Sequence, residues 1–188
     1  TITDQSGNSS QAQANITVED SINPTALAQN ITVQLDASGN ASISATDVDD
    51  GSFDNCTITD RSLNISSFTC SDLGVNPVTL TITDQRGNSS QAQANVTVED
   101  SIDPTALAKD ITVQLDASGN ASISATDVDD GSFDNCAITD RSLNISSFTC
   151  SDLGVNPVTL TITDQSGNSS QAQANVTVED SINPTALA

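Results

Sequence analysis

Residues 78–98 read VTLTITDQRGNSSQAQANVTV, two alternating stretches separated by a turn. Apolar side chains at Val78, Leu80 and Ile82 alternate with threonine, and residues 92–98 alternate apolar with polar side chains in the same way. A period of two residues places successive side chains on opposite faces of a strand. The segment DQRGN contains a glycine and an aspartate, which favour a turn. This stretch therefore predicts a β-hairpin with one face in the core.

The same alternation recurs through the preceding residues, and no apolar period of 3.6 residues persists, so we expect no helix. Phe53 and Phe68 are the largest candidates for the core. The further predicted strands are 31–35, 41–45, 56–59 and 65–70, with a turn at 37–40. Short strands with turns about every 8–12 residues are typical of a small immunoglobulin-like sandwich. The predicted fold class is all-β, in tandem immunoglobulin-like β-sandwich modules of about 80 residues.

The chain also repeats itself. Residues 1–80 return as residues 81–160 with six differences, and a third copy begins at Thr161. A period of this length indicates an array of modules, each about one domain in size.

Module boundaries are expected near residues 19–24 and their copies at 99–104 and 179–184, since the proline that ends each segment cannot continue a strand ladder. Either the chain is a window from a longer array, or its end fragments complete sheets of neighbouring chains. The predicted divisions are a C-terminal hairpin of a preceding repeat (1–20), two immunoglobulin-like repeats (21–100 and 101–180), and the first strand of a following repeat (181–188).

The charge balance limits the possible functions. The chain has 25 Asp or Glu, 4 Lys or Arg and no His, giving a formal net charge of −21. Nucleic acids and anionic membranes require basic patches, so cations are the favoured partners. Glycoside hydrolysis uses two carboxylates, but Tyr and Trp platforms are absent, as is any histidine, so we expect no enzyme. The sequence contains no run of about 18 apolar residues, so we predict no membrane insertion for this segment.

Each repeat carries one pair of cysteines, Cys56 with Cys70 and Cys136 with Cys150. A disulfide within each repeat would close a loop of about 15 residues and contribute about 3 kcal/mol. The alternatives are buried thiols or half of a metal site, although zinc is disfavoured without histidine or a second cysteine pair in the module. Disulfides would place the protein outside the cytoplasm.

Acidic residues are concentrated in the segment DVDDGSFDN, residues 47–55. Ca²⁺ takes six to eight oxygen ligands, which carboxylates and amides on a turning loop can supply. The loop matches no EF-hand, and the alternative is a solvated acidic loop that keeps the protein soluble. The predicted calcium ligands here are Asp47, Asp49, Asp50, Asp54 and Asn55, with their copies Asp127, Asp129, Asp130, Asp134 and Asn135.

A second acidic group lies at the module boundaries, where Glu99-Asp100 precedes a proline and Glu179-Asp180 repeats the pattern. These carboxylates could share a cation with a loop of the adjoining module and lock the hinge; the alternative is an ordinary charged linker. Asp36 and Asp84 begin turns, where we expect each to accept bonds from its own backbone.

Several short motifs occur in a fixed order within the repeat. They are Asp54-Asn55-Cys56, Phe68-Thr-Cys70, Asp72-Leu-Gly74-Val-Asn76, Val78-Thr-Leu-Thr-Ile-Thr-Asp84, Gly87-Asn88-Ser, Val96-Thr-Val98-Glu-Asp100 and Pro104. Across its whole length the repeat resembles the HYR-type immunoglobulin-like repeats of giant secreted surface proteins in gliding marine and soil bacteria. Many such repeats carry a further cysteine after the Gly-Asn turn, where this chain has Gln91 and Ala92. That departure supports pairing Cys56 with Cys70.

The resemblance implies adhesion, or a stalk or filament, at the bacterial cell surface. The leading hypothesis is a structural, calcium-loaded rod outside the cell, with other copies of the chain as possible partners in a multi-chain fibre. The alternative is a multivalent module in which each repeat weakly binds a glycan or a host or prey surface. The sequence does not indicate the ligand at the tip.

Overall fold

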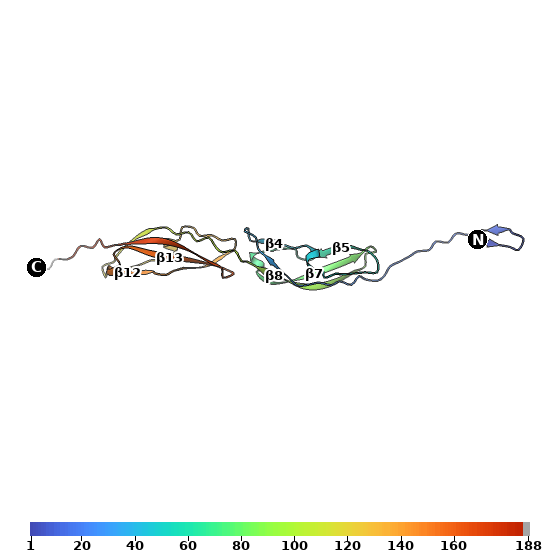
Figure 1. The fold of residues 1–188 in the computed structure, drawn as a ribbon, viewed down its shortest axis with the longest axis horizontal. Helices are drawn as coiled ribbons and strands as arrows, with labels where there is room; N and C mark the ends of the chain where they lie inside the picture. Colours follow the sequence, from blue (N-terminus) through green and yellow to red (C-terminus); the bar gives the residue numbers. More distant parts are fainter. Residues whose placement is uncertain (186–188) are drawn as a thin grey trace.

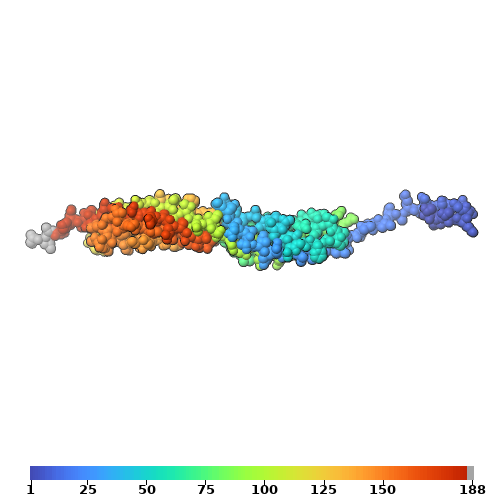
Figure 2. Space-filling model, in the orientation of Figure 1, coloured from blue at the N-terminus to red at the C-terminus, as the bar shows by residue number. Residues whose placement is uncertain are grey.

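The computed structural model describes residues 1–185, in which two β-sandwiches lie end to end along one long axis (Figure 1). The space-filling view shows a slender rod in which the two sandwiches touch (Figure 2). The fold class is all-β, in tandem immunoglobulin-like modules, as the alternating strands predict. None of the helices in this part of the chain is long and apolar enough to cross a membrane.

The two complete repeats contain the same elements in the same order. The first comprises β3 (Ile31–Gln34), β4 (Asn40–Ser42), α1 (Ala45–Val48), β5 (Ile58–Leu63), β6 (Ser67–Thr69), η1 (Cys70–Asp72), β7 (Gly74–Asp84) and β8 (Ser89–Glu99). The second comprises β9 (Ile111–Gln114), β10 (Asn120–Ser122), α2 (Ala125–Val128), β11 (Ile138–Leu143), β12 (Ser147–Thr149), η2 (Cys150–Asp152), β13 (Gly154–Asp164) and β14 (Ser169–Glu179).

Each repeat has one larger and one smaller sheet. The larger sheet has the order β3-β8-β7-β5, in which β3 runs parallel to β8 and the other pairs are antiparallel. The smaller sheet pairs β4 with β6. The predicted hairpin is confirmed as β7 and β8, whose residues Val78, Leu80, Ile82 and Val96 are buried.

Two features differ from the sequence prediction. A one-turn helix, α1, follows β4 because the Asp47 carboxylate accepts hydrogen bonds from the backbone N–H and the hydroxyl of Ser44, both at 2.7 Å. Such a capping box stabilises a turn too short to show helical periodicity. Of the two candidates for the core, Phe68 is buried there at 1% exposure, whereas Phe53 is 59% exposed in the acidic loop.

Strand direction determines which residues meet at the two ends of a repeat. Gly154, where β13 begins, pairs with Val178 near the end of β14, whereas Thr163 pairs with Ser169 at the opposite end. We call the end with the β13–β14 turn the N-terminal pole, and the end where the chain leaves β14 the C-terminal pole. The corresponding turn in the first repeat joins β7 and β8.

The flanking residues form little structure. At the N-terminus, β1 (Ile2–Thr3) pairs with β2 (Ser9–Ser10), while Ile16 and Val18 are exposed. Residues 181–185 form no strand, and the rest of the strand expected at 181–188 lies outside the described residues.

Candidate metal centre at the junction between repeats

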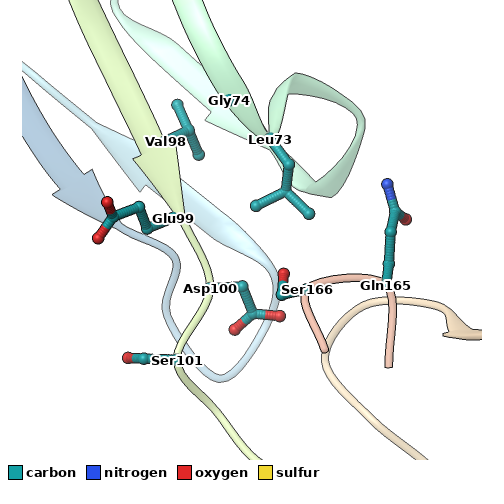
Figure 3. A pocket seen from close by; sticks show the side chains of 8 residues that line it. All are labelled: Leu73, Gly74, Val98, Glu99, Asp100, Ser101, Gln165 and Ser166. Atoms are coloured by element: carbon teal, nitrogen blue, oxygen red, sulfur yellow. The ribbon is translucent and has the colours of Figure 1, made fainter. Parts of the chain in front are cut away.

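Three carboxylates from both repeats meet at the junction. One oxygen each from Asp100, Asp134 and Asp164 lies within 4.8 Å of the others. Asp100 follows β8 at the C-terminal pole of the first repeat, whereas Asp134 and Asp164 come from the N-terminal pole of the second. Figure 3 shows Asp100 beside Ser166, which lies on the facing β13–β14 turn. The cluster therefore forms only when the two repeats are in contact.

Two of the three carboxylates are buried and the third, Asp134, is half-buried, and none of them forms an ion pair within residues 1–185. Asp100 is 7% exposed and Asp164 is 2% exposed. The ion pairs found among residues 1–185 join Arg61 to Asp49 and Arg141 to Asp129, which lie elsewhere. Like charges at such short range repel one another strongly away from bulk water. A bound cation would relieve that repulsion.

Several oxygens at the site also lack hydrogen bonds. Asp100 Oδ2, Asp134 Oδ1 and Asn135 Oδ1 are buried with no partner among the described residues. Leaving a buried acceptor unpaired costs about 1–3 kcal/mol, and more for a charged group. Unpaired carboxylate and amide oxygens are the hard ligands that Ca²⁺ prefers. The donor set therefore fits a calcium ion.

Hydrogen bonds hold the carboxylates in place. Asp164 Oδ1 accepts from the backbone N–H groups of Ser166 (2.9 Å) and Asn168 (2.8 Å). Asn168 Nδ2 donates to Asp164 Oδ2 at 2.8 Å and to the Asp100 carbonyl oxygen across the junction at 3.1 Å. Asp134 Oδ2 accepts from the backbone N–H of Cys136 at 3.0 Å. These contacts orient the oxygens before any ion binds.

The aspartates predicted to begin turns do so. Asp36 accepts hydrogen bonds from the backbone N–H of Ser38 at 2.8 Å, and Asp84 from that of Asn88 at 2.8 Å. Burial acts to raise the pKa of Asp84, but hydrogen bonds, led by the Asn88 side chain, outweigh it and hold this pKa below its usual value.

A related cluster lies at the N-terminal pole of the first repeat, where Asp20, Asp54 and Cys56 come together. Asp54 Oδ1 is again buried without a partner, and Asn55 Nδ2 lies 3.4 Å from both oxygens of Asp20. The hydrogen bond with the Cys56 thiol is the main cause that lowers the pKa of Asp20. The same contact raises the pKa of the Cys56 thiol, as do burial and the neighbouring carboxylates.

The acidic loop is divided between two roles. Its first part is structural, since Asp47 caps α1 and Asp49 pairs with Arg61 at 2.7 Å. Asp127 and Asp129 repeat these contacts, with Arg141 as the ion-pair partner at 2.9 Å. In its second part, Asp134-Asn135 faces the junction between the repeats, and the copy Asp54-Asn55 lies beside Asp20. The exposed Asp50 and Asp130 join no cluster of three among the described residues.

The remaining predicted ligands make contacts of other kinds. Glu99 Oε2 accepts from Gln34 Nε2 at 2.8 Å, and Glu179 Oε2 accepts from Gln114 Nε2 at 2.6 Å. Each pair joins neighbouring strands of the larger sheet, so the structure does not bring these glutamates into the cluster. Asp180 Oδ1 accepts from the backbone N–H of Ile182 at 2.9 Å.

The disulfide lies between repeats rather than within them. Cys70 is bonded to Cys136 across the junction, with a sequence separation of 66, while Cys56 and Cys150 are unpaired. The predicted pairs Cys56–Cys70 and Cys136–Cys150 are therefore wrong. Cys136 precedes β11 at the N-terminal pole of its repeat, and Cys150 follows β12 at the C-terminal pole. In the first repeat, Cys56 likewise lies at the N-terminal pole and Cys70 at the C-terminal pole.

The distance between poles makes the predicted pairing impossible. An 11-residue strand such as β13 runs between them and spans about 36 Å. A disulfide requires Cα atoms within about 7 Å. Fourteen residues separate the cysteines in the sequence, but those residues cross the whole repeat.

Gly39 allows the close approach at the disulfide. It has a positive φ of 72°, and a Cβ there would lie 2.7 Å from both the Asn135 carbonyl oxygen and Cys70 Sγ. Asn135 Nδ2 also donates across the junction to the Asp36 carbonyl oxygen at 3.2 Å. A side chain at position 39 is therefore incompatible with the observed contact between repeats.

We expect Gly39→Ala to prevent the inter-repeat disulfide, because the new Cβ would collide with backbone of the second repeat. A thiol titration of the denatured, unreduced protein should find four free cysteines instead of two. Gly119→Ala is the matched control: its φ is 78° and its Cβ would meet only Cys150 Sγ, so two free cysteines should remain. Two free thiols in both variants would contradict the proposed contact.

Sequence reasoning missed Asp164 as a candidate ligand and gave its copy Asp84 only a role in the turn. Asp164 lies 30 residues beyond Asp134 in the sequence, so no local spacing connects them. The topology could have indicated Asp164. The last two strands of a repeat form an antiparallel hairpin that ends at the C-terminal pole, so the turn of this hairpin, which contains Asp164, must lie at the N-terminal pole, where Asp100 of the preceding repeat arrives.

No protein-family model matches the sequence, and no curated protein sequence is similar to it. Solved structures similar to the chain include human protocadherin-24 EC1-2, with 12% identity, a TM-score of 0.44, and coverage of 85% of this chain and 99% of that one. Drosophila N-cadherin EC1-4 has 15% identity, a TM-score of 0.41, and coverage of 84% and 50%. Protocadherin gamma B7 extracellular domains 1–4 have 13% identity, a TM-score of 0.39, and coverage of 84% and 51%. The chain therefore spans about half the length of the last two, and these values assign it to no family.

Proposed function

We propose that this chain is a structural repeat region of an extracellular fibre or adhesin stalk at a bacterial cell surface, built from HYR-type repeats. In this proposal each junction between repeats is locked by a calcium ion, and the role is mechanical rather than catalytic. The observation that carries the proposal is the cluster of buried Asp100 and Asp164 with half-buried Asp134, which both repeats supply and no cationic side chain neutralises in the described part of the chain.

A shared ion would act on the hinge. The first repeat contributes Asp100, and the second contributes the other two carboxylates, so bending the junction would separate ligands from the ion. The energetic benefit of binding is therefore available only in the straight arrangement, which makes calcium a stiffening agent. An unoccupied cluster would repel itself and favour bending.

The inter-repeat disulfide supports an extracellular location. Disulfides persist in oxidising environments and are rare in the cytosol. The Cys70–Cys136 bond joins the two repeats covalently at their junction, which suits a rod that must not come apart.

Assembly of several chains into one fibre is part of the proposal. One edge strand of each larger sheet, β3 in the first repeat and β9 in the second, has the sequence ITVQ and contains no charged side chain to discourage pairing with another chain. The formal net charge of −21 opposes side-by-side packing, so cations would also be needed between chains.

One observation favours a second candidate function, multivalent adhesion. Phe53 and Phe133 are each 59% exposed at equivalent positions of the two repeats. Regularly spaced aromatic side chains could each bind a glycan or cell surface weakly, with avidity along the array. Glycan binding by the chain that is lost in the Phe53→Ala/Phe133→Ala variant would favour this alternative.

The test of the leading proposal is electron microscopy of a polypeptide with many copies of the repeat, in millimolar calcium and after EDTA. We expect straight rods or fibres in calcium and curved, flexible chains after EDTA, because the empty clusters repel. Adding a reductant with EDTA should increase the flexibility further. Rods that stay equally straight in EDTA and reductant would contradict a role for calcium in stiffness.

A further inference from the structure

We propose that the inter-repeat disulfide carries tension past most of each folded sandwich and limits how far the rod can be stretched. This inference extends the proposed function, since it concerns a rod under load, but it depends on the cysteine positions and not on calcium. Cys70 lies at the C-terminal pole of the first repeat and Cys136 at the N-terminal pole of the second. A pulling force applied to the two ends of the chain therefore crosses the junction through the sulfur atoms.

The disulfide removes a long segment from the load path. The residues between Cys70 and Cys136 include β7, β8, the linker, β9 and β10. Among them is the pairing of β7 with β8, which extends over ten residue pairs from Gly74↔Val98 to Thr83↔Ser89. Because the covalent bond bypasses this segment, unfolding it would add no length to the chain.

The same arrangement recurs at the other pole of the second repeat. Cys150 Sγ lies 3.7 Å from the Gly119 carbonyl oxygen, as Cys70 Sγ lies 3.8 Å from that of Gly39. Cys150 therefore presents the half-junction that Cys70 presents, and in an array of repeats its partner would be a cysteine placed like Cys136 in the next repeat. Each such bond forms when two thiols lose two protons and two electrons to a disulfide-bearing oxidant, which is reduced to a dithiol.

In an array, the force would then enter each repeat at a cysteine like Cys136 and leave at one like Cys150. Only 14 residues separate them, and these residues already cross the repeat through β11 and β12. Fully extended, 14 residues reach about 50 Å, compared with about 36 Å for the 11-residue strand alongside. An unfolded repeat without the bypass would reach about 280 Å.

The test is single-molecule force spectroscopy of the 188-residue chain held at its two ends. With the disulfide intact, complete unfolding should give a contour length about 23 nm shorter than in a reductant, since 66 residues at about 3.5 Å each are bypassed. Adding the reductant while the unfolded chain is held under force should release that length in a single step.

Two double variants complete the test. Cys70→Ser/Cys136→Ser should give the full length without a reductant, and Cys56→Ser/Cys150→Ser should behave as the oxidised wild type. Equal contour lengths with and without a reductant would overturn the inference. Two separate shortfalls in contour length of about 5 nm each would also overturn it, because they are expected for disulfides within repeats. The shortfall in contour length should persist in EDTA, because it depends on the disulfide and not on calcium. A failure of this inference can therefore be distinguished from a failure of the proposed calcium-dependent stiffness.

Discussion

Asp100→Asn is expected to lower the calcium affinity of the junction at least about 100-fold, because it removes one of three clustered carboxylates and the only one supplied by the first repeat. Asparagine keeps the size and one oxygen of the side chain, so the effect reports on ligand charge rather than on packing. Isothermal titration of the chain with calcium chloride measures the affinity directly. The related cluster at Asp20 and Asp54 should continue to bind in the variant, if it binds in the wild type.

Asp130→Asn is the matched control. It makes the same change of charge on the same chain, but Asp130 is exposed and belongs to no such cluster within residues 1–185. We expect its calcium affinity to equal that of the wild type. An equal loss in the two variants would mean that calcium responds to the overall negative charge, and the junction site would be rejected.

Cys70→Ser/Cys136→Ser is expected to lower the free energy of unfolding by about 4 kcal/mol, the loop-entropy estimate for a closed loop of 66 residues. The effect should be felt by both repeats, because the closed loop contains β7 and β8 of one and β9 and β10 of the other. Urea unfolding followed by circular dichroism, without a reductant, measures the change.

Cys56→Ser/Cys150→Ser replaces the same number of cysteines without breaking the disulfide at the junction, since both of these cysteines are unpaired. Its urea midpoint should stay at the wild-type value in calcium. A midpoint lowered as far as in Cys70→Ser/Cys136→Ser would show that the bonds form within the repeats after all.

The strands could be predicted from the sequence because their signal is local. The alternation from Val78 to Ile82 places those side chains in the core whatever lies on either side, and the structure buries them. The helix α1 could not be predicted from hydrophobic period, because it is a single turn stabilised by Ser44 and Asp47. Size alone made Phe53 a candidate for the core, but its position in the acidic loop leaves it exposed.

The site was harder to predict because it depends on which pole each residue occupies. Asp100 and Asp134 were recognised as acidic positions, and a cation shared across the module boundary was among the hypotheses. Their meeting with Asp164 depends on strand direction. The cysteines show the same limit, since Cys56 and Cys70 are close in the sequence but lie at opposite ends of a repeat. Pairing between Cys70 and Cys136 follows only when repeats are placed end to end.

The most direct test of a junction cross-linked from repeat to repeat is a tryptic disulfide map of the unreduced chain. Cleavage after Arg61, Arg86, Lys109 and Arg141 places each of the four cysteines in its own peptide. The structure predicts that the peptide 62–86 is linked to the peptide 110–141, and that the peptides containing Cys56 and Cys150 are not linked to either. Links from 1–61 to 62–86 and from 110–141 to 142–188 would contradict the account.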